Sequence, residues 1–236
     1  AASDVYKRQE VDQLVANKSF KKDEAIFNVL REYIKESKNI LFEGNSYGKE
    51  WEKEAVKRGL SNNKTTPEAV KVKVKKESID LYSEMEVMND KEIRARLEIE
   101  FKAYSLRIQL EGRVLGDIAM NHVIPTAVNY QNTLIRNVRG LKEVFGKEFE
   151  TVAKEQMDLI KKISEHISGI TIKTNAMVEE RKKANKTVDE EKKAILYCEK
   201  VKPYFDKIRH HCDKLELMID DELWPLVHYR EMLFTR

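Results

Sequence analysis

Three long runs of the chain carry apolar residues in steps of three and four, the spacing that aligns side chains on one face of an α-helix. The runs lie between residues 93 and 118, between 149 and 177, and between 195 and 219. A helix with a single apolar face cannot bury that face by itself, so the three runs must pack against one another. The sequence therefore predicts an all-α protein, in which a helical lead-in is followed by an antiparallel bundle of three long helices.

The composition is typical of long helices that are exposed to water. Of the 236 residues, 36% are charged, and the chain has only 8 glycines and 4 prolines, unlike β-sandwiches or doubly wound sheets. The 44 basic and 41 acidic residues leave a net charge of +3, too small to indicate a nucleic-acid partner. No apolar run approaches the roughly 18 residues of a membrane span, and no secretory signal is visible. We therefore expect no membrane partner and a cytoplasmic location.

The first part of the chain is predicted to form shorter helices. Apolar spacing predicts a helix from Lys21 to Phe42, which the run GNSYG, residues 44–48, interrupts. A short charged helix follows and ends at Gly59, a suitable C-terminal cap. Thr66 and Pro67 predict the next helix start, because the hydroxyl can cap free amides and proline needs no donor at the first helical position.

The segment after Pro67 has two interpretations. Val70, Val72 and Val74 alternate with lysines in the period of a half-buried strand. The threonine cap before them and the lack of a partner strand favour a helix. Asn89 or Asp90 then opens the first long helix.

Two corners separate the long helices. Gly140 and Gly146 bracket the first corner. The run ANKTV, residues 184–188, forms the second, with Thr187 as its candidate N-terminal cap.

Pro125 lies inside the first long helical pattern, where it removes one amide donor and costs on the order of 3 kcal/mol unless compensated. Six polar residues surround it: Asn121, His122, Thr126, Asn129, Gln131 and Asn132. One interpretation is a helix kinked at Pro125 whose freed backbone groups are satisfied by these side chains. The other is a polar surface that docks on another domain.

We find no arrangement of residues that carries catalysis. GNSYGKE, residues 44–50, is one residue short of a phosphate-binding loop and has Glu50 in place of the magnesium-binding hydroxyl, so we interpret it as a turn. No histidine follows a carboxylate by three positions, which argues against a di-iron site. Asp206, His210 and Asp213 share a helical face, but surface ion pairing is the preferred interpretation. We predict no catalytic, cofactor-binding or metal-binding residue in this chain.

Five further residues are interpreted as structural. Gly112 and Gly116 form a face that should let another helix approach closely in a water-soluble core. Trp224 should be a large buried anchor near the chain end. Cys198 and Cys212 lie fourteen positions apart on one expected helix, about 21 Å along its axis, so we expect reduced thiols and no disulfide.

Several separated motifs, in a fixed order, give a resemblance to a known family. They are GNSYG with Glu50 and Trp51, KRGL at 57–60, KTTP at 64–67, RVLGD at 113–117, the run from Asn121 to Gly146, KPYF at 202–205, HCDKL at 211–215 and the Trp224 tail. Through them, the chain from Glu10 to Arg236 resembles the C-terminal part of type III glutamine synthetases (glutamate–ammonia ligases). One departure is Val227-His228, where the family more often has a proline and a lysine.

The resemblance implies an activity for the parent protein. That activity is ATP-dependent ligation of ammonia to L-glutamate, giving L-glutamine through γ-glutamyl phosphate, with Mg²⁺ or Mn²⁺ as metal cofactor. The family carries its metal ligands and phosphate-binding arginines on a curved sheet that precedes Glu10, so no catalytic residue is carried onto this chain.

The resemblance also implies a division of the chain and its partners. Residues 10–88 would be the end of the catalytic region and a connector, and residues 89–236 a C-terminal helical bundle. Residues 1–9 have no match in the family, and we interpret them as a non-native extension. The segment is expected to brace the catalytic domain of its own subunit and to support a homo-oligomeric double ring, without being active alone.

Leu14, Phe20 and Phe27 are expected to pack on the catalytic domain, so this chain alone should expose apolar surface. The alternative to a glutamine synthetase segment is a free-standing helical interaction or scaffold module.

Overall fold

The computed structural model describes residues 2–16 and 21–234, and every regular element in these ranges is a helix. The expected all-α class is confirmed. The chain divides into two units after Asn63.

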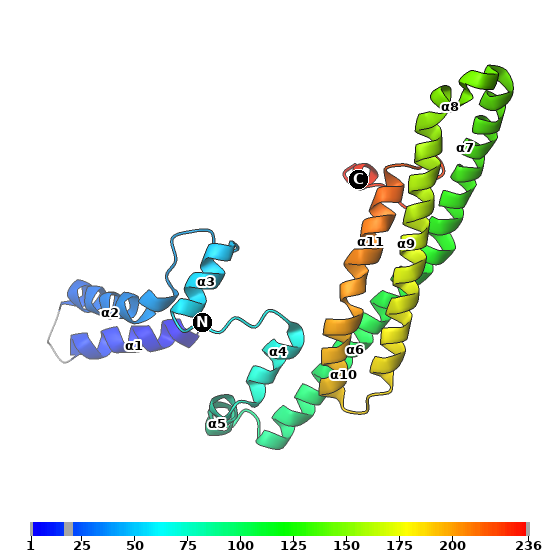
Figure 1. Ribbon diagram of the computed structural model, residues 1–236. Helices are drawn as coiled ribbons and strands as arrows, with labels where there is room; N and C mark the ends of the chain where they lie inside the picture. The colour runs from blue at the N-terminus through cyan, green and yellow to red at the C-terminus, as the bar shows by residue number, and fades with distance from the viewer. Residues whose placement is uncertain (1, 17–20, 235–236) are drawn as a thin grey trace. The chain divides into compact units, whose positions relative to one another are not determined.

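The first unit contains three α-helices: α1 (Ala2–Ala16), α2 (Lys22–Glu36) and α3 (Lys49–Lys57). α1 and α2 lie side by side (Figure 1). α1 passes through the described part of the expected extension without a break at Glu10. Together with a 3-10 turn (Ser37–Ile40), α2 covers most of the first helix that the sequence predicts.

The predicted turn before α3 and the cap after it are both confirmed. In the GNSYG loop, the Asn45 carbonyl accepts a hydrogen bond from the Gly48 N–H at 2.9 Å. Gly59 has a φ of +82°, a left-handed conformation that glycine adopts without steric cost. The rings of Phe42 and Trp51 pack with their centroids 4.7 Å apart, which holds α3 against the segment before the loop.

The second unit begins with α4 (Thr66–Lys71), a 3-10 turn (Val72–Val74) and α5 (Lys76–Glu84). The three valines therefore belong to helical turns, as predicted, and not to a strand. The N-cap of α4 is Thr65, one residue before the expected position. Its hydroxyl accepts from the Glu68 N–H, and the Glu68 carboxylate accepts from the Thr65 N–H, so each residue satisfies one free amide of the helix start.

The first turns of the second unit pack on the first long helix. Val70 and Val74 contact a small buried cluster centred on Leu97 and Phe101. Residues 64–88 therefore share a unit with the bundle. The division after residue 88 that the resemblance implied stays a prediction about the parent protein.

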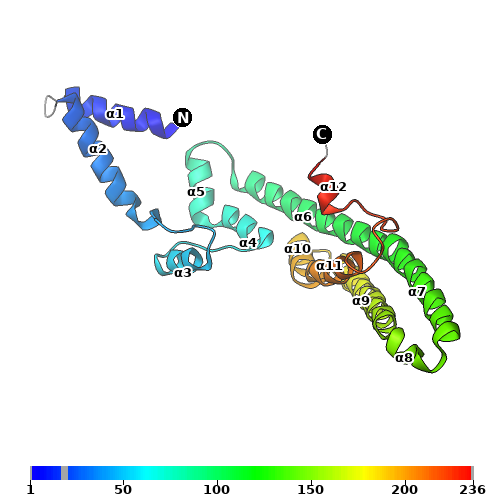
Figure 2. The same ribbon diagram turned by 90° about the horizontal axis from the view of Figure 1, so that it is seen from above.

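Three long helices form the bundle, and two of them contain a π-helical turn. The first consists of α6 (Asp90–Ile118), a π-turn (Ala119–Val123) and α7 (Ile124–Phe145), and the second is α9 (Lys154–Asn185). The third consists of α10 (Glu190–Leu196), a π-turn (Tyr197–Val201) and α11 (Pro203–Glu216). The short helices α8 (Phe149–Val152) and α12 (Tyr229–Met232) precede α9 and follow α11. Figures 1 and 2 show successive long helices running antiparallel, with α9 packed along both α7 and α11.

The helix ends differ in part from the prediction. α6 begins at the expected cap, Asn89. Gly140 lies inside α7, and the chain turns instead at Gly146, where φ is +55°. The cap of α10 is Asp189 and not Thr187, because the Asp189 carboxylate accepts a backbone N–H at 2.8 Å.

Side chains from all three long helices meet in one core. Its largest fully buried members are Val123, Ile163, Ile170, Met177, Tyr197, Val201, Ile208 and Leu215. Burying each such apolar side chain contributes about 1.5–3 kcal/mol. Trp224 is 8% exposed, which confirms the expected anchor, although α11 already ends at Glu216. No described helix combines the length and the apolar character needed to cross a bilayer.

The glycine face of α6 meets its neighbours at close range, as predicted. A Cβ atom added to Gly112 would lie 3.2 Å from the ring of Phe205 on α11, and one added to Gly116 would lie 3.5 Å from the Thr174 methyl on α9. A side chain at Gly112 would therefore require the Phe205 ring to shift by a few tenths of an ångström, whereas a Cβ at Gly116 would make an ordinary van der Waals contact.

The two glycines at the α7 corner give opposite predictions for one substitution. Nothing lies within 4 Å of a Cβ added to Gly140, so Gly140→Ala should raise the free energy of unfolding by about 0.5–1 kcal/mol. Gly146 has a left-handed φ, so Gly146→Ala should lower it by roughly 1 kcal/mol. Urea denaturation of both variants measures the difference. Stabilisation by Gly146→Ala would contradict the path of this corner.

Candidate functional site

Several amide side chains surround the helix irregularity before Pro125. In a regular α-helix, this proline would lack a donor and crowd the carbonyl four residues earlier. Here the Ile124 N–H instead bonds to the carbonyl of Ala119, five residues earlier, which widens the helix by one residue ahead of the proline ring. Ala119 and Val123 are fully buried, so the π-turn places its small apolar side chains in the core.

Amide side chains near Pro125 tie α7 to α9. The Gln131 amide donates to the Ile160 carbonyl at 2.9 Å and to the Ser164 hydroxyl at 2.6 Å. The Asn137 amide donates to the Gln156 side-chain oxygen at 2.6 Å. These bonds fix the register between the two helices.

The sequence suggested that polar side chains around Pro125 satisfy the backbone groups that the proline frees, but two of these side chains bond elsewhere. The Asn121 amide donates to the Asp117 carboxylate at 2.5 Å, and Gln131 bonds to α9, so neither bonds to the backbone that the proline disturbs. The π-turn itself accommodates the proline. His122, Asn129 and Asn132 are exposed, and a docking role for this surface stays a prediction.

The same arrangement recurs at Pro203, which we did not predict. The Lys202 N–H bonds to the carbonyl of Tyr197 at 2.9 Å, again five residues earlier, and the third long helix bends at residue 202. Tyr197 is buried, and its hydroxyl donates to the Asn185 side-chain oxygen at 2.6 Å. A proline inside a long apolar pattern was the signal that could have revealed this bend.

Histidines from α9 and α11 meet on one side of the bundle. Nδ1 of His166 lies 3.0 Å from Nδ1 of His211, so one ring donates and the other accepts. The His210 ring packs edge-on against His211, with 5.4 Å between centroids. Gly169 leaves the space for this contact, because a Cβ there would lie 2.6 Å from the His211 ring. We did not predict this pair, since its members lie 45 positions apart.

Burial determines the charge of the histidine pair. It lowers the pKa of both His166 and His211, and the positive charge of neighbouring histidines lowers the pKa of both rings further. The pair is therefore mainly neutral at pH 7 and holds α9 and α11 together through one hydrogen bond.

The predicted face of Asp206, His210 and Asp213 does not gather around a common point. Asp213 lies 3.5 Å from Nε of Arg209, which is the surface ion pairing that the sequence favoured. In residues 2–16 and 21–234, no three or more histidine, cysteine, aspartate or glutamate side chains are arranged to hold a metal ion.

The two cysteines form no disulfide. Cys198 and Cys212 are free thiols, as their spacing predicted. Burial raises the pKa of Cys212 to about 11. Its thiolate, the nucleophilic form, is therefore scarce at neutral pH.

His228 holds the chain end against α11. The buried His228 ring stacks on Trp224, with 6.5 Å between centroids. Its Nδ1 lies 2.9 Å from a carboxylate oxygen of Glu216. This contact links the last segment of the chain to the end of α11.

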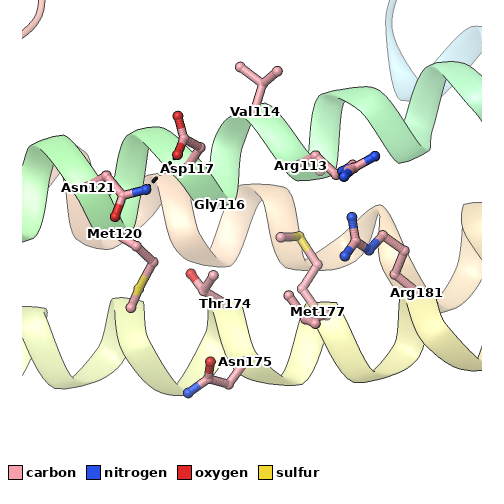
Figure 3. Close-up of a pocket in the computed structure, with 12 residues that line it drawn as sticks. Arg113, Val114, Gly116, Asp117, Met120, Asn121, Thr174, Asn175, Met177 and Arg181 are labelled. Atoms are coloured by element: carbon pink, nitrogen blue, oxygen red, sulfur yellow. Dashed lines mark hydrogen bonds between the residues drawn. The ribbon is translucent and has the colours of Figure 1, made fainter.

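A hollow of about 570 Å³ lies between α6 and α9 (Figure 3). Gly112 and Gly116 line one side, and Met120 and Met177 supply apolar surface. The volume lies within the range of roughly 300–1,000 Å³ that is usual for small-molecule sites.

Comparison with known proteins gives a consistent set of relatives. Residues 25–142, from α2 into α7, match the family described as "Glutamine synthetase C-terminal domain". The chain is 44% identical over 227 residues to a glutamine synthetase of Bacteroides fragilis (strain YCH46), covering 96% of this chain and 31% of that protein. It is 25% identical over 217 residues to the type-3 glutamine synthetase of Dictyostelium discoideum, covering 90% and 29%. It is 27% identical over 212 residues to a glutamine synthetase of Butyrivibrio fibrisolvens, covering 90% and 30%. The chain thus spans less than a third of the length of these relatives.

The histidine pair predicts a loss of stability in mild acid. Because the pKa of each ring lies below its ordinary value of 6.5 in the folded chain, the unfolded chain binds more protons as the pH falls. The contribution of the histidine pair to the free energy of unfolding is therefore complete above pH 6.5. It is lost as the pH falls through the pKa values of the two rings in the folded chain. Urea denaturation between pH 7.5 and pH 5.0 should show this fall in the free energy of unfolding.

Two variants test whether the histidine pair causes this pH dependence. His166→Gln/His211→Gln should flatten the pH dependence, whereas His122→Gln, at an exposed position, should leave it unchanged. An unaltered slope in the double variant would contradict the assignment.

Proposed function

Because this chain belongs to the glutamine synthetase C-terminal domain family, as its resemblance to the type III enzymes implied, we propose that it forms the C-terminal portion of a type III glutamine synthetase subunit. One observation carries the proposal: a match that runs over 96% of this chain takes up only 31% of the Bacteroides fragilis relative. The remaining length of such a protein is where we place its catalytic domain.

The proposed parent reaction is ATP-dependent ligation of ammonia to L-glutamate in the cytoplasm, with Mg²⁺ or Mn²⁺. Such chemistry needs clustered carboxylates for the metal ions and cations for the phosphates. The described residues do not fit a metal site, because no three metal-ligating side chains converge among them. We therefore assign the ATP and metal sites to the part of the parent that precedes this chain, and we derive no catalytic step from its residues.

We assign a bracing role to the bundle, and the outer side of α6 supports this assignment. Ile99, Leu106, Leu110 and Val114 are 66%, 54%, 53% and 56% exposed. Their spacing of seven, four and four places them together, opposite the core-facing side of the helix. A helix with a second apolar face is typical of one that packs on a further partner. We propose that this outer stripe contacts the catalytic domain or a neighbouring subunit of a double ring.

The first unit offers a second surface for the same role. Phe27, Leu30 and Ile34 on α2 are 65%, 55% and 64% exposed. Of the residues expected to pack on the catalytic domain, Phe27 is thus exposed, Leu14 is partly buried, and Phe20 lies outside the described residues. The alternative, a free-standing scaffold module, has no specific observation in its favour.

The purified 236-residue chain should form no glutamine from glutamate, ammonia and ATP with Mg²⁺ or Mn²⁺, because the reacting groups lie elsewhere in the proposed parent. Coupled detection of ADP and direct measurement of glutamine test this, with the full-length parent as the positive control. Glutamine formation by the chain alone at a rate comparable to the parent would overturn the proposal.

The outer stripe should make the isolated chain associate and bind a hydrophobic dye. Leu106→Gln/Leu110→Gln should reduce both effects in sedimentation and dye fluorescence, because it removes apolar surface without touching the core. Val188→Gln is the matched control, since Val188 is 92% exposed but lies alone in a corner. A native chain that sediments as a single monomer without dye binding would count against the docking role.

A further inference from the structure

The outer stripe of α6 has positive charge along both of its sides. Figure 3 shows the Val114 side chain of this stripe pointing away from α9. At about 100° per residue, four exposed cationic side chains lie within roughly 75° of the centre of the stripe. They are Arg96, Lys102, Arg107 and Arg113. Within the described ranges, none of the four takes part in an ion pair. The stripe is therefore an apolar surface with a basic rim.

The acidic residues of the same stretch of α6 do not cancel this charge. Three glutamates lie farther round the helix, toward its core-facing side: Glu98, Glu100 and Glu111. Glu100 is in addition paired with Lys73 at 2.6 Å. Asp117 lies just past the stripe, and its carboxylate accepts a hydrogen bond from the Asn121 amide at 2.5 Å. A surface that complements the stripe should therefore combine apolar side chains with negative charge.

Residues 216–227, which we call the acidic segment, carry that combination. The segment contains no lysine or arginine, and its four acidic residues are Glu216, Asp220, Asp221 and Glu222. Four of its apolar side chains are exposed: Leu217 (80%), Leu223 (41%), Leu226 (40%) and Val227 (64%). The acidic segment thus exposes apolar side chains among carboxylates, whereas the outer stripe exposes them among cations.

Buried side chains hold the acidic segment in place. Ile219 and Trp224 are 5% and 8% exposed, and both belong to the core that the three long helices share. The Asp220 carboxylate accepts a hydrogen bond from the Glu222 N–H at 2.9 Å, which fixes the turn between these two anchors. A segment that is already ordered loses little conformational freedom on binding, so its exposed leucines can be buried at a low entropic cost.

We propose that the acidic segment of one copy of this chain docks on the outer stripe of another copy. The apolar side chains of the two surfaces pack together, and the carboxylates lie along the basic rim. Contacts between two stripes or between two acidic segments are disfavoured, because like charges would face each other. The inference rests on the bracing role proposed above, and it narrows the partner of the outer stripe to a second copy of this chain.

Two charge reversals test this docking by sedimentation of the full 236-residue chain. Lys102→Glu/Arg107→Glu gives the stripe an acidic rim, and Asp221→Lys/Glu222→Lys gives the segment a basic character. Each variant alone should associate roughly ten-fold more weakly than the native chain, because like charges then meet. An equimolar mixture of the two variants should associate as the native chain does, because opposite charges again meet wherever unlike copies touch.

Two further variants serve as controls. Lys161→Glu/Lys162→Glu on α9 makes the same change in net charge at exposed positions outside the stripe, and it should leave the association unchanged. Asp221 lies 3.7 Å from Nε2 of His228, so its reversal could disturb the fold of the segment. Glu222→Lys alone avoids that contact, should keep the melting temperature of the native chain, and should still weaken the association.

Three results would contradict the docking of two copies. The first is native association that persists in both reversed variants, and the second is a mixture of the two variants that stays dissociated. The third is a native chain that remains monomeric yet binds the hydrophobic dye, which would leave the outer stripe to the catalytic domain and the bracing role intact. A monomeric chain without dye binding would count against both.

Discussion

The packing of the three long helices around one core, with α9 along α7 and α11 and α6 along α10, is the constraint on which the bundle depends. Helix pairs pack at distances that their contacting side chains determine, and small residues allow the shortest ones. Gly112 meets Phe205 on α11, Gly116 meets Thr174 on α9, and Gly169 on α9 leaves space for the His211 ring. An added Cβ at Gly112 or Gly169 would force a neighbouring ring to move, whereas one at Gly116 would make an ordinary contact. The hollow between α6 and α9 is lined by Gly112 and Gly116.

Prolines inside the long helices impose a second constraint, because each lacks a backbone N–H. The chain accommodates two of them in the same way, with a π-turn. Pro125 and Pro203 each follow a five-residue π-turn, and both turns pack on α9. α9 itself runs for 32 residues without interruption, and the two long helices that pack on it each contain a π-turn. π-turns within long helices often accompany functional sites. Here the first of them adjoins the stretch of α6 that lines the hollow.

The sequence was sufficient for features that depend on local chemistry. The apolar periodicity predicted the three long helices, and Asn89, Gly59 and the GNSYG turn lie where their capping and turn preferences place them. Features that depend on long-range packing were not accessible. A period of three to four residues does not distinguish an α-helical from a π-helical turn, so both π-turns were missed. The contact between His166 and His211, and the hollow between α6 and α9, arise only when the rotation of each helix about its axis is known.

These elements support an account in which a rigid helical bundle braces the proposed parent enzyme while other parts of the subunit react. The outer stripe of α6 and the exposed face of α2 are the surfaces through which it would do so. The most direct test is to truncate the full-length parent after the residue equivalent to Asn63 and to measure its assembly by sedimentation. If the bundle braces the subunit, the truncated protein fails to form the parent's oligomer. A truncated protein that assembles and forms glutamine as the full-length parent does would contradict it.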